Sequence, residues 1–199
     1  MVLLDARQPA AVANTETSPT GLERGLAAAH ELISEMLASR NRVGLAVIGV
    51  ANDAGKQYTW LDPDSGRLHY SRLQTLLNTT AESLSDDGTE ESYAAPDPAE
   101  FVAEMAPRSQ VVMLSPLVDA YPVSVATQLR ATGRNVSVYS PDVTARESPG
   151  GALQTARRRR QLYALRSRGI TTVDWRAEEP LSVALDRVSS QSASGVFLR

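Results

Sequence analysis

One apolar stretch, residues 43–50, restricts the possible folds of this chain more than any other feature. Its sequence, VGLAVIGV, is apolar at both sets of alternating positions, so both faces of a strand formed here must be covered. Strands of this kind lie inside parallel sheets that have helices packed on each side. The stretch therefore predicts an α/β protein in which residues 43–50 form a central strand.

Strand-like and helix-like segments alternate along the rest of the chain. Apolar or alternating runs predict strands at residues 2–4, 43–50, 58–61, 111–114, 136–139 and 171–175. Helical spacing of apolar residues predicts helices at residues 22–37, 71–84, 98–105, 123–131, 153–168 and 181–188, with an acidic loop at 85–91. This order predicts one domain over residues 1–199, with a three-layer Rossmann-like fold: a mostly parallel sheet of about six strands and helices on both faces. The one-sided run at 58–61 is expected to be an antiparallel edge strand.

The composition excludes several classes of function. The 199 residues include 20 Lys and Arg against 23 Asp and Glu, which gives a net charge of −3. This balance argues against general affinity for nucleic acid or for a membrane surface. Cysteine is absent, which excludes disulfides, thiolate metal sites and a cysteine nucleophile. No apolar run approaches the roughly 20 residues that cross a bilayer.

The segment around Lys56 resembles a phosphate-binding loop but departs from that pattern. Five residues separate Gly49 from Gly55, whereas a P-loop has four, and Gln57 stands where the loop needs a hydroxyl group. The residues that follow are typical of a strand, although a P-loop must open a helix. We therefore predict a hairpin turn through residues 52–55, with Lys56 as a surface residue that binds no nucleotide. No cofactor is expected.

Two histidines are the candidates for a base that works near neutral pH. His30 and His69 both fall on or beside predicted helices, and the sequence lacks the Gly-x-Ser-x-Gly elbow of a serine hydrolase. Helix-surface positions explain both histidines more simply than catalysis does. We therefore predict that the protein is not an enzyme.

Four consecutive arginines, Arg157, Arg158, Arg159 and Arg160, form the sharpest charge feature. Consecutive residues point around a helix instead of lining one face, and an acidic partner or a phosphate group would relieve the repulsion between the arginines. We predict that the run is exposed and docks on an acidic protein surface. Solvated arginines on an outer helix and contact with nucleic acid are the alternatives.

Four segments, in their order along the chain, resemble the von Willebrand factor A fold, and specifically the domain of unknown function family fifty-eight. They are residues 41–47 (NRVGLAV), 111–119 (VVMLSPLVD), 135–139 (NVSVY) and 165–175 (LRSRGITTVDW). Family members usually carry membrane helices before this domain. The resemblance therefore implies that the chain, which starts directly on a predicted strand, was cut from a longer protein at the cytoplasmic face of a membrane. This segment itself is expected to make no membrane contact.

The resemblance also implies where a metal ion would bind. In the family, a D-x-S-x-S motif after the first strand holds a divalent cation at the carboxyl edge of the sheet. Asp5 keeps the first position of this motif, whereas Arg7 and Pro9 replace the two serines. A positive charge on Arg7 would disfavour the ion, and Asp5 could pair with Arg7 instead.

The remaining ligands of the family site are also altered. The family has an Asp after the fourth strand, where this chain has Pro116, which leaves Ser115 and the more distant Asp119. The loop at residues 92–97 has no threonine to match the Thr of the family site, although Asp97 could replace it. The resemblance therefore implies a degraded site with no bound metal, with a weak residual site as the alternative.

These observations lead to one functional hypothesis and two alternatives. The chain is expected to be a non-catalytic protein-interaction module, whose partner docks near Asp5, Arg7, Asp97, Ser115 and Asp119 and on the arginine run. By resemblance, that partner is a MoxR-type AAA ATPase acting in complex assembly or maturation. The first alternative is an enzyme that acts on a small phosphorylated substrate, with Arg7 as the anion clamp. The second is binding of nucleic acid through the arginine run.

Overall fold

A computed structural model of the protein describes residues 1–15, 17–83, 95–106, 109–144, 149–176 and 179–184. The strands are β1 (Val2–Asp5), β2 (Val43–Ile48), β3 (Tyr58–Asp64), β4 (Gln110–Leu114), β5 (Asn135–Pro141) and β6 (Thr171–Trp175). The helices are η1 (Gln8–Ala10), α1 (Gly21–Ala38), α2 (Arg67–Ser83), α3 (Pro98–Glu104), α4 (Tyr121–Ala131) and α5 (Pro149–Arg166). The predicted acidic loop at 85–91 and the end of the helix predicted at 181–188 lie outside the described residues; residues 181–184 are helical.

The strands form one six-stranded sheet in the order β3-β2-β1-β4-β5-β6. All neighbours pair in parallel except β3, which pairs antiparallel with β2 at the edge. β2 lies between β1 and β3, so the prediction that residues 43–50 form a strand inside the sheet is confirmed, although the strand ends at Ile48 and lies next to the edge strand. The predicted antiparallel edge strand is confirmed as well. β3 continues past the predicted end at residue 61 to Asp64. This is the predicted Rossmann-like arrangement.

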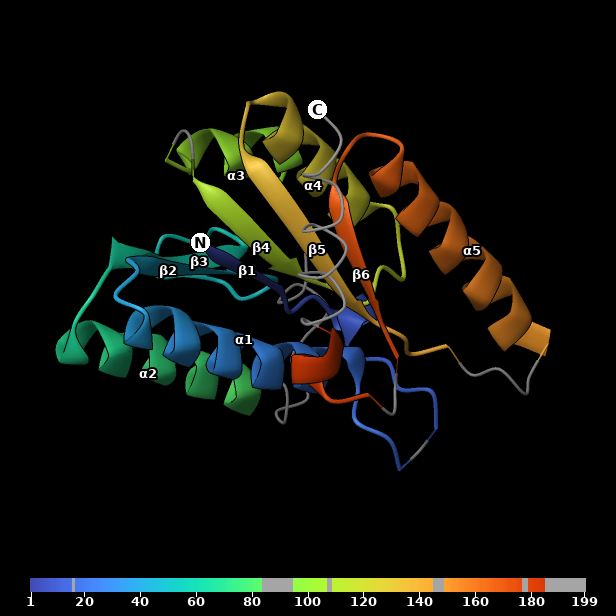
Figure 1. Cartoon of the computed structure of the whole chain (residues 1–199), viewed down its shortest axis with the longest axis horizontal. Helices are drawn as coiled ribbons and strands as arrows, with labels where there is room; N and C mark the ends of the chain where they lie inside the picture. The colour runs from blue at the N-terminus through green and yellow to red at the C-terminus, as the bar shows by residue number, and fades with distance from the viewer. Residues whose placement is uncertain (16, 84–94, 107–108, 145–148, 177–178, 185–199) are drawn as a thin grey trace, which may run out of the picture.

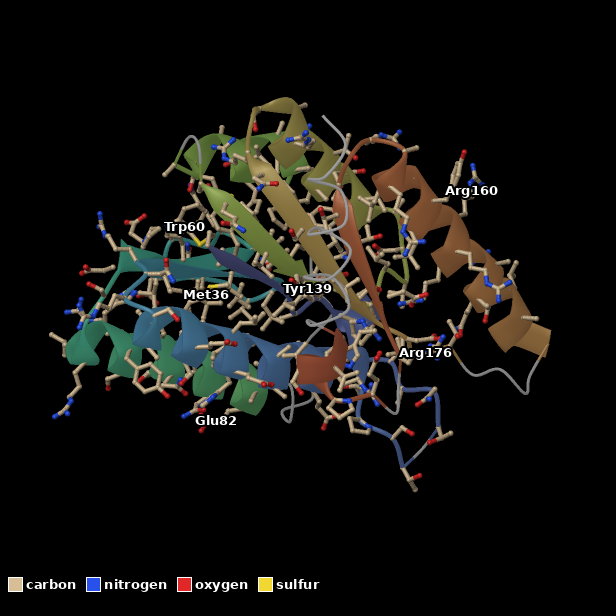
Figure 2. All side chains as sticks on the ribbon, in the orientation of Figure 1. Met36, Trp60, Glu82, Tyr139, Arg160 and Arg176 are labelled. Carbon is tan, nitrogen blue, oxygen red and sulfur yellow. The ribbon has the colours of Figure 1, made fainter. Side chains whose placement is uncertain are left out.

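Helices cover both faces of the sheet (Figure 1). One core contains residues of α1 and α2, and the other contains residues of α3, α4 and α5. Successive strand residues point to opposite faces, so Leu4 belongs to the first core and Leu3 to the second. Side chains fill the space between the sheet and both helix layers (Figure 2). The result is the three-layer fold predicted from the alternation of strands and helices.

The start of α1 is set by local sequence and lies against the carboxyl edge of the sheet. Thr20 and Glu23 form a capping box: the Glu23 backbone N–H donates to Thr20 Oγ1 at 3.1 Å, and the Thr20 N–H donates to Glu23 Oε2 at 2.7 Å. At Gly21, an added Cβ would lie 2.8 Å from Pro116 Cβ. The absence of a side chain at Gly21 therefore lets the first turn of α1 pack directly on the loop that follows β4.

The segment around Lys56 forms a hairpin turn, as predicted. Asn52 organises this turn, since its side-chain oxygen accepts hydrogen bonds from the Ala54 N–H at 2.9 Å and the Lys56 N–H at 3.1 Å. Strand β3 follows where a P-loop would open a helix. The Lys56 ammonium group forms an ion pair with Glu104 at the end of α3, so it links the hairpin to α3.

None of the described helices is both long and apolar enough to span a membrane.

Candidate functional site

The candidate site lies at the carboxyl ends of β1 and β4, where the connections leave the sheet in opposite directions. β1 leads to α1 on one face, and β4 leads to α4 on the other. In open parallel sheets, ligands bind at such a switch point. Four of the residues predicted from the sequence, Asp5, Arg7, Ser115 and Asp119, form one hydrogen-bonded network here.

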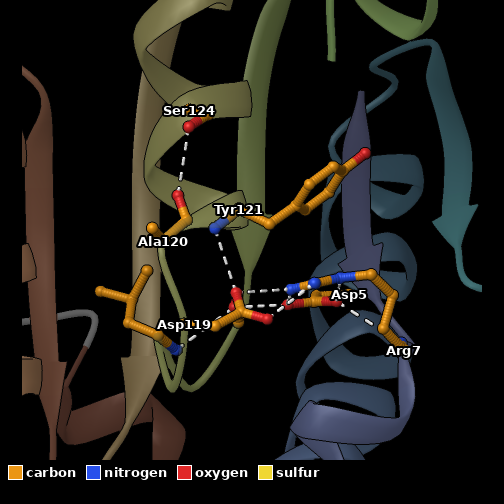
Figure 3. A network of polar contacts seen from close by, with 8 residues as sticks. Asp5, Arg7, Asp119, Ala120, Tyr121 and Ser124 are labelled. Atoms are coloured by element: carbon orange, nitrogen blue, oxygen red, sulfur yellow. Dashed lines mark hydrogen bonds and ion pairs between the residues drawn. The ribbon is translucent and has the colours of Figure 1, made fainter. Parts of the chain in front are cut away.

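The guanidinium group of Arg7 lies between two carboxylates (Figure 3). Arg7 Nε and Nη2 donate to Asp5 Oδ1 at 2.8 Å and to Asp5 Oδ2 at 3.0 Å. Arg7 Nη1 and Nη2 donate to Asp119 Oδ2 at 2.9 Å and to Asp119 Oδ1 at 3.1 Å. Burial opposes the charge on Arg7, but the charges and hydrogen bonds of the two carboxylates outweigh burial and raise the pKa of Arg7. The pairing of Asp5 with Arg7 is confirmed. Asp119 is a second carboxylate partner of the same guanidinium group.

Ser115 supports the buried end of this network. Its hydroxyl group donates to Asp5 Oδ2 at 2.7 Å and accepts a hydrogen bond from the Leu117 N–H at 3.3 Å. Asp5, Arg7 and Ser115 are only 1%, 3% and 1% exposed. The Asp119 side chain, by contrast, is 37% exposed. A partner protein that docks at this site would therefore contact the side chain of Asp119. The three buried residues would hold Asp119 in position.

Tyr121 is the site residue that the sequence analysis missed. Arg7 Cζ lies 4.3 Å from the centre of its ring, a cation–π contact, and its backbone N–H donates to Asp119 Oδ1 at 3.1 Å. The Tyr121 hydroxyl group is buried and has no hydrogen-bond partner among the described residues. Burial raises the pKa of Tyr121 well above its usual range, and the carboxylates of Asp5, Asp97 and Asp119 raise it further against the opposing effect of Arg7. Its place two residues after Asp119, at the start of α4, was the available signal.

The backbone on both sides of the network has an unusual conformation. Gly49 has φ = 93°, and an added Cβ would lie 2.7 Å from the backbone N and Cα of Arg7. Only glycine fits here, so a glycine of the P-loop-like segment serves to let β2 approach Arg7. Leu117 has φ = 55° although it is not a glycine, and it is fully buried. A non-glycine residue in this backbone conformation destabilises the folded state by about 1–3 kcal/mol. Leu117 lies in the loop that leads from β4 to Asp119.

Asp97 lies near this site but does not join the network. Its side chain accepts hydrogen bonds from the Ala99 N–H at 2.7 Å and from the Glu100 N–H at 3.1 Å, and so caps α3. It is exposed, and it is close enough to Tyr121 to contribute to the raised pKa of that residue. Asp97 therefore adds a second exposed carboxylate close enough to Tyr121 to act on it.

The prediction that all four consecutive arginines are exposed is wrong for Arg158. This residue is 5% exposed. Arg158 Nη1 donates to Asp174 Oδ1 at 2.7 Å, and Nη2 donates to the backbone oxygen of Ser140 at 2.7 Å. Arg158 therefore anchors α5 to β5 and β6. Arg157, Arg159 and Arg160 are exposed, as predicted.

The histidines also differ from one another. His30 is exposed, as expected, whereas His69 is 7% exposed. His69 Nε2 lies 2.6 Å from the backbone oxygen of Val43, so this nitrogen carries the proton and donates. The expectation of a surface position is therefore wrong for His69, which ties α2 to the start of β2.

The residues present do not fit a divalent cation. Nitrogen atoms of Arg7 contact both oxygens of Asp5 and both oxygens of Asp119, so the guanidinium group occupies the space where shared carboxylates would coordinate an ion. Among the described residues, no group of three or more His, Cys, Asp or Glu side chains could hold a metal.

No protein-family model matches the chain, and no curated protein matches it. The geometry of the Asp5–Arg7–Asp119 network therefore carries the functional argument.

Proposed function

We propose that this chain is a non-catalytic protein-interaction module of the von Willebrand factor A type, in which an arginine replaces the metal ion of the adhesion site. The observation that carries the proposal is the position of the Arg7 guanidinium group between the carboxylates of Asp5 and Asp119. A cation is needed there to hold two carboxylates together, and Arg7 supplies a permanent one. The site needs no metal for its structure.

The strand order supports the same proposal. The resemblance to the von Willebrand factor A fold places the ion-binding residues after the first and fourth strands, which are neighbours in this sheet. Asp5 and Arg7 follow β1, and Ser115 and Asp119 follow β4. The network thus lies where the resemblance would put the metal site, with the guanidinium group of Arg7 in place of a metal ion.

The exposed part of the site indicates the chemistry of the partner. Asp119 presents a carboxylate at this edge of the sheet, and Asp97 presents one close enough to act on Tyr121. A partner surface with Lys or Arg side chains or with free N–H groups would complement these carboxylates. The resemblance suggests a MoxR-type AAA ATPase as that partner, in complex assembly or maturation. Asp5, Arg7 and Ser115 act in this proposal by positioning Asp119.

The alternative role of Arg7 as an anion clamp is disfavoured. Four of the five N–H donors of a guanidinium group point at carboxylate oxygens of Asp5 and Asp119, and Arg7 is 3% exposed. A phosphate group would have to displace a carboxylate in order to reach Arg7. We therefore propose no enzymatic function.

The test is binding of the purified chain to the MoxR-type ATPase of the organism that encodes it, measured by calorimetry. Asp119→Asn removes one exposed charge and should weaken binding by about tenfold or more, as expected for a charged contact at an interface. Asp53→Asn is the matched control, because Asp53 is an exposed carboxylate in the hairpin turn. Equal affinity of Asp119→Asn and wild type would refute docking at this edge. Hydrolysis of a phosphorylated substrate that disappears in Asp5→Asn would refute the non-catalytic assignment.

A further inference from the structure

Helix α5 carries a strong positive charge that the site at β1 and β4 does not explain. Its sequence, PGGALQTARRRRQLYALR, contains five arginines and no Asp or Glu. Arg158 faces the sheet and binds Asp174. Among the residues that the structure describes, none forms a hydrogen bond or ion pair with the side chain of Arg157, Arg159 or Arg160. Within the described part of the chain, the positive charge on the outer face of α5 is therefore not neutralised, although the net charge of the whole chain is −3.

Two exposed apolar side chains flank this charge. Leu153 is 54% exposed and Tyr163 is 73% exposed, and they are among the few large apolar side chains exposed in the described part of the chain. Leu153, Arg157, Arg160 and Tyr163 follow one another at intervals of three or four residues, which places them along one side of a helix. These four residues form a stripe about 15 Å long, which we call the α5 stripe. Arg160 points away from the sheet (Figure 2).

We propose that the α5 stripe is a second docking surface, which binds an acidic segment of a partner protein. Carboxylates three or four residues apart on a partner helix would face Arg157 and Arg160. Apolar residues at the two ends of that segment would contact Leu153 and Tyr163. This surface has the opposite charge to the Asp119 edge of the sheet, so the proposal is independent of the proposed function.

The chemistry of the stripe favours this occupant. Arginine forms two-pronged hydrogen bonds with carboxylates and loses less hydration than lysine when it is covered. Arginine and tyrosine are also the side chains most enriched where protein interfaces derive their affinity. A nucleic acid fits less well, because the positive charge is confined to one helix of a net acidic chain and Arg158 turns inward.

The proposal can be tested by fluorescence anisotropy with a labelled helical peptide about four turns long. The peptide carries Glu pairs three and four residues apart and Leu near both ends; a second peptide has Gln in place of Glu. Arg157→Glu combined with Arg160→Glu should weaken binding of the Glu peptide by about tenfold or more, and binding should fall as salt rises. Tyr163→Ala should weaken it by a smaller factor. Arg67→Glu combined with Arg72→Glu is the matched control, because these arginines are exposed on α2, in the helix layer on the other face of the sheet.

The outcomes separate the alternatives. Normal binding by the Arg67 and Arg72 double variant and by Asp119→Asn, together with loss in the Arg157 and Arg160 double variant, supports the proposal. Equal loss in both double variants would show a general charge effect and overturn it. Tighter binding of a generic single-stranded RNA than of the Glu peptide would overturn it in favour of nucleic acid. Equal binding of the Glu and Gln peptides would also overturn it. Far-ultraviolet circular dichroism of each variant checks that the fold is retained.

Discussion

At the scale of single residues, three buried arginines show how this protein places positive charge inside its fold. Arg7, Arg134 and Arg158 are 3%, 4% and 5% exposed. Arg7 binds two carboxylates, whereas Arg158 binds Asp174 and a backbone oxygen. Arg134 donates to backbone oxygens at the end of α3, including that of Val102 at 3.2 Å. Each guanidinium group is paired, as a buried charge must be, and only Arg7 lies at the switch point of the sheet.

Removing the cation from the site should destabilise the fold strongly. Arg7→Met leaves Asp5 buried with Ser115 as its remaining side-chain partner, and breaking a buried pair costs about 3–5 kcal/mol. Denaturation with urea should show this loss. The double variant Asp5→Asn with Arg7→Met should recover part of it, because the unpaired buried charge is then absent. A loss below about 1 kcal/mol in Arg7→Met, typical of a surface change, would contradict the assigned role.

The wild-type protein is expected to bind neither magnesium nor manganese at sub-millimolar concentrations. Arg7 would repel the ion, and its carboxylate neighbours are already paired. Calorimetric titration should therefore give no binding heat, and the melting temperature should not change when a chelator is added. A binding isotherm that disappears in Asp5→Ala would show instead that the site still holds a metal.

Tyr121 should make the protein sensitive to alkaline pH. Burial raises its pKa above the ordinary value of 10.0, so the tyrosine ionises in the unfolded chain before it ionises in the folded chain. The folded state then binds more protons, and stability should fall as pH rises above about 10. Tyr121→Phe should show a smaller fall with no loss of stability at neutral pH, because the buried hydroxyl group has no partner among the described residues. Identical alkaline profiles for the two proteins would refute this assignment.

At the scale of elements, α5 shows how one helix divides a run of identical residues between two roles. Arg158 lies four residues before Leu162 and seven before Leu165, and all three are buried. This is the spacing of a helix face that packs on a sheet. The neighbouring arginines fall outside that face and remain exposed. The run is therefore one anchor with exposed charges on both sides of it.

Substitutions within the run should separate these roles. Arg158→Ala should lower the free energy of unfolding by about 1–3 kcal/mol, because buried hydrogen bonds to Ser140 and Asp174 are lost. Arg159→Ala, its exposed neighbour, should change stability by no more than about 0.5 kcal/mol. Chemical denaturation of both variants gives the comparison. Equal effects of the two substitutions would mean that Arg158 does not anchor the helix.

At the scale of the whole molecule, one sheet joins two cores. Adjacent residues of a single strand, such as Leu3 and Leu4, belong to opposite cores. A strand that leaves the sheet would therefore open both cores together. This arrangement couples the α1–α2 layer to the layer formed by α3, α4 and α5.

We accordingly expect unfolding in one cooperative transition. Far-ultraviolet circular dichroism reports the helices, and the fluorescence of Trp60 and Trp175 reports opposite edges of the sheet, on β3 and β6. Both signals should give the same midpoint in urea, as for a two-state domain. Two separate midpoints would show that the sheet holds more than one folding unit.

The sequence alone determined the order of elements and the positions of the strands. Residues 111–114 and 171–175 were predicted within one residue of the observed β4 and β6, since an apolar strand core is a local property of the chain. The resemblance to the von Willebrand factor A fold also implied that the residues after β1 and β4 would share one edge of the sheet. Helix starts were less accurate: α5 begins at Pro149, before the predicted residue 153, because proline fits a first helical turn.

Only the tertiary structure decided what those residues do. The hydrogen bonds between Arg7 and Asp119 join positions 112 residues apart, and no local pattern encodes such a pairing. The fit of Gly49 against the backbone of Arg7 likewise depends on how closely β1 and β2 approach. Local propensity depends on neighbours in the sequence, whereas burial and charge pairing depend on neighbours in space. For this reason the sequence located the candidate site, and the packing of the sheet decided that Arg7 fills it.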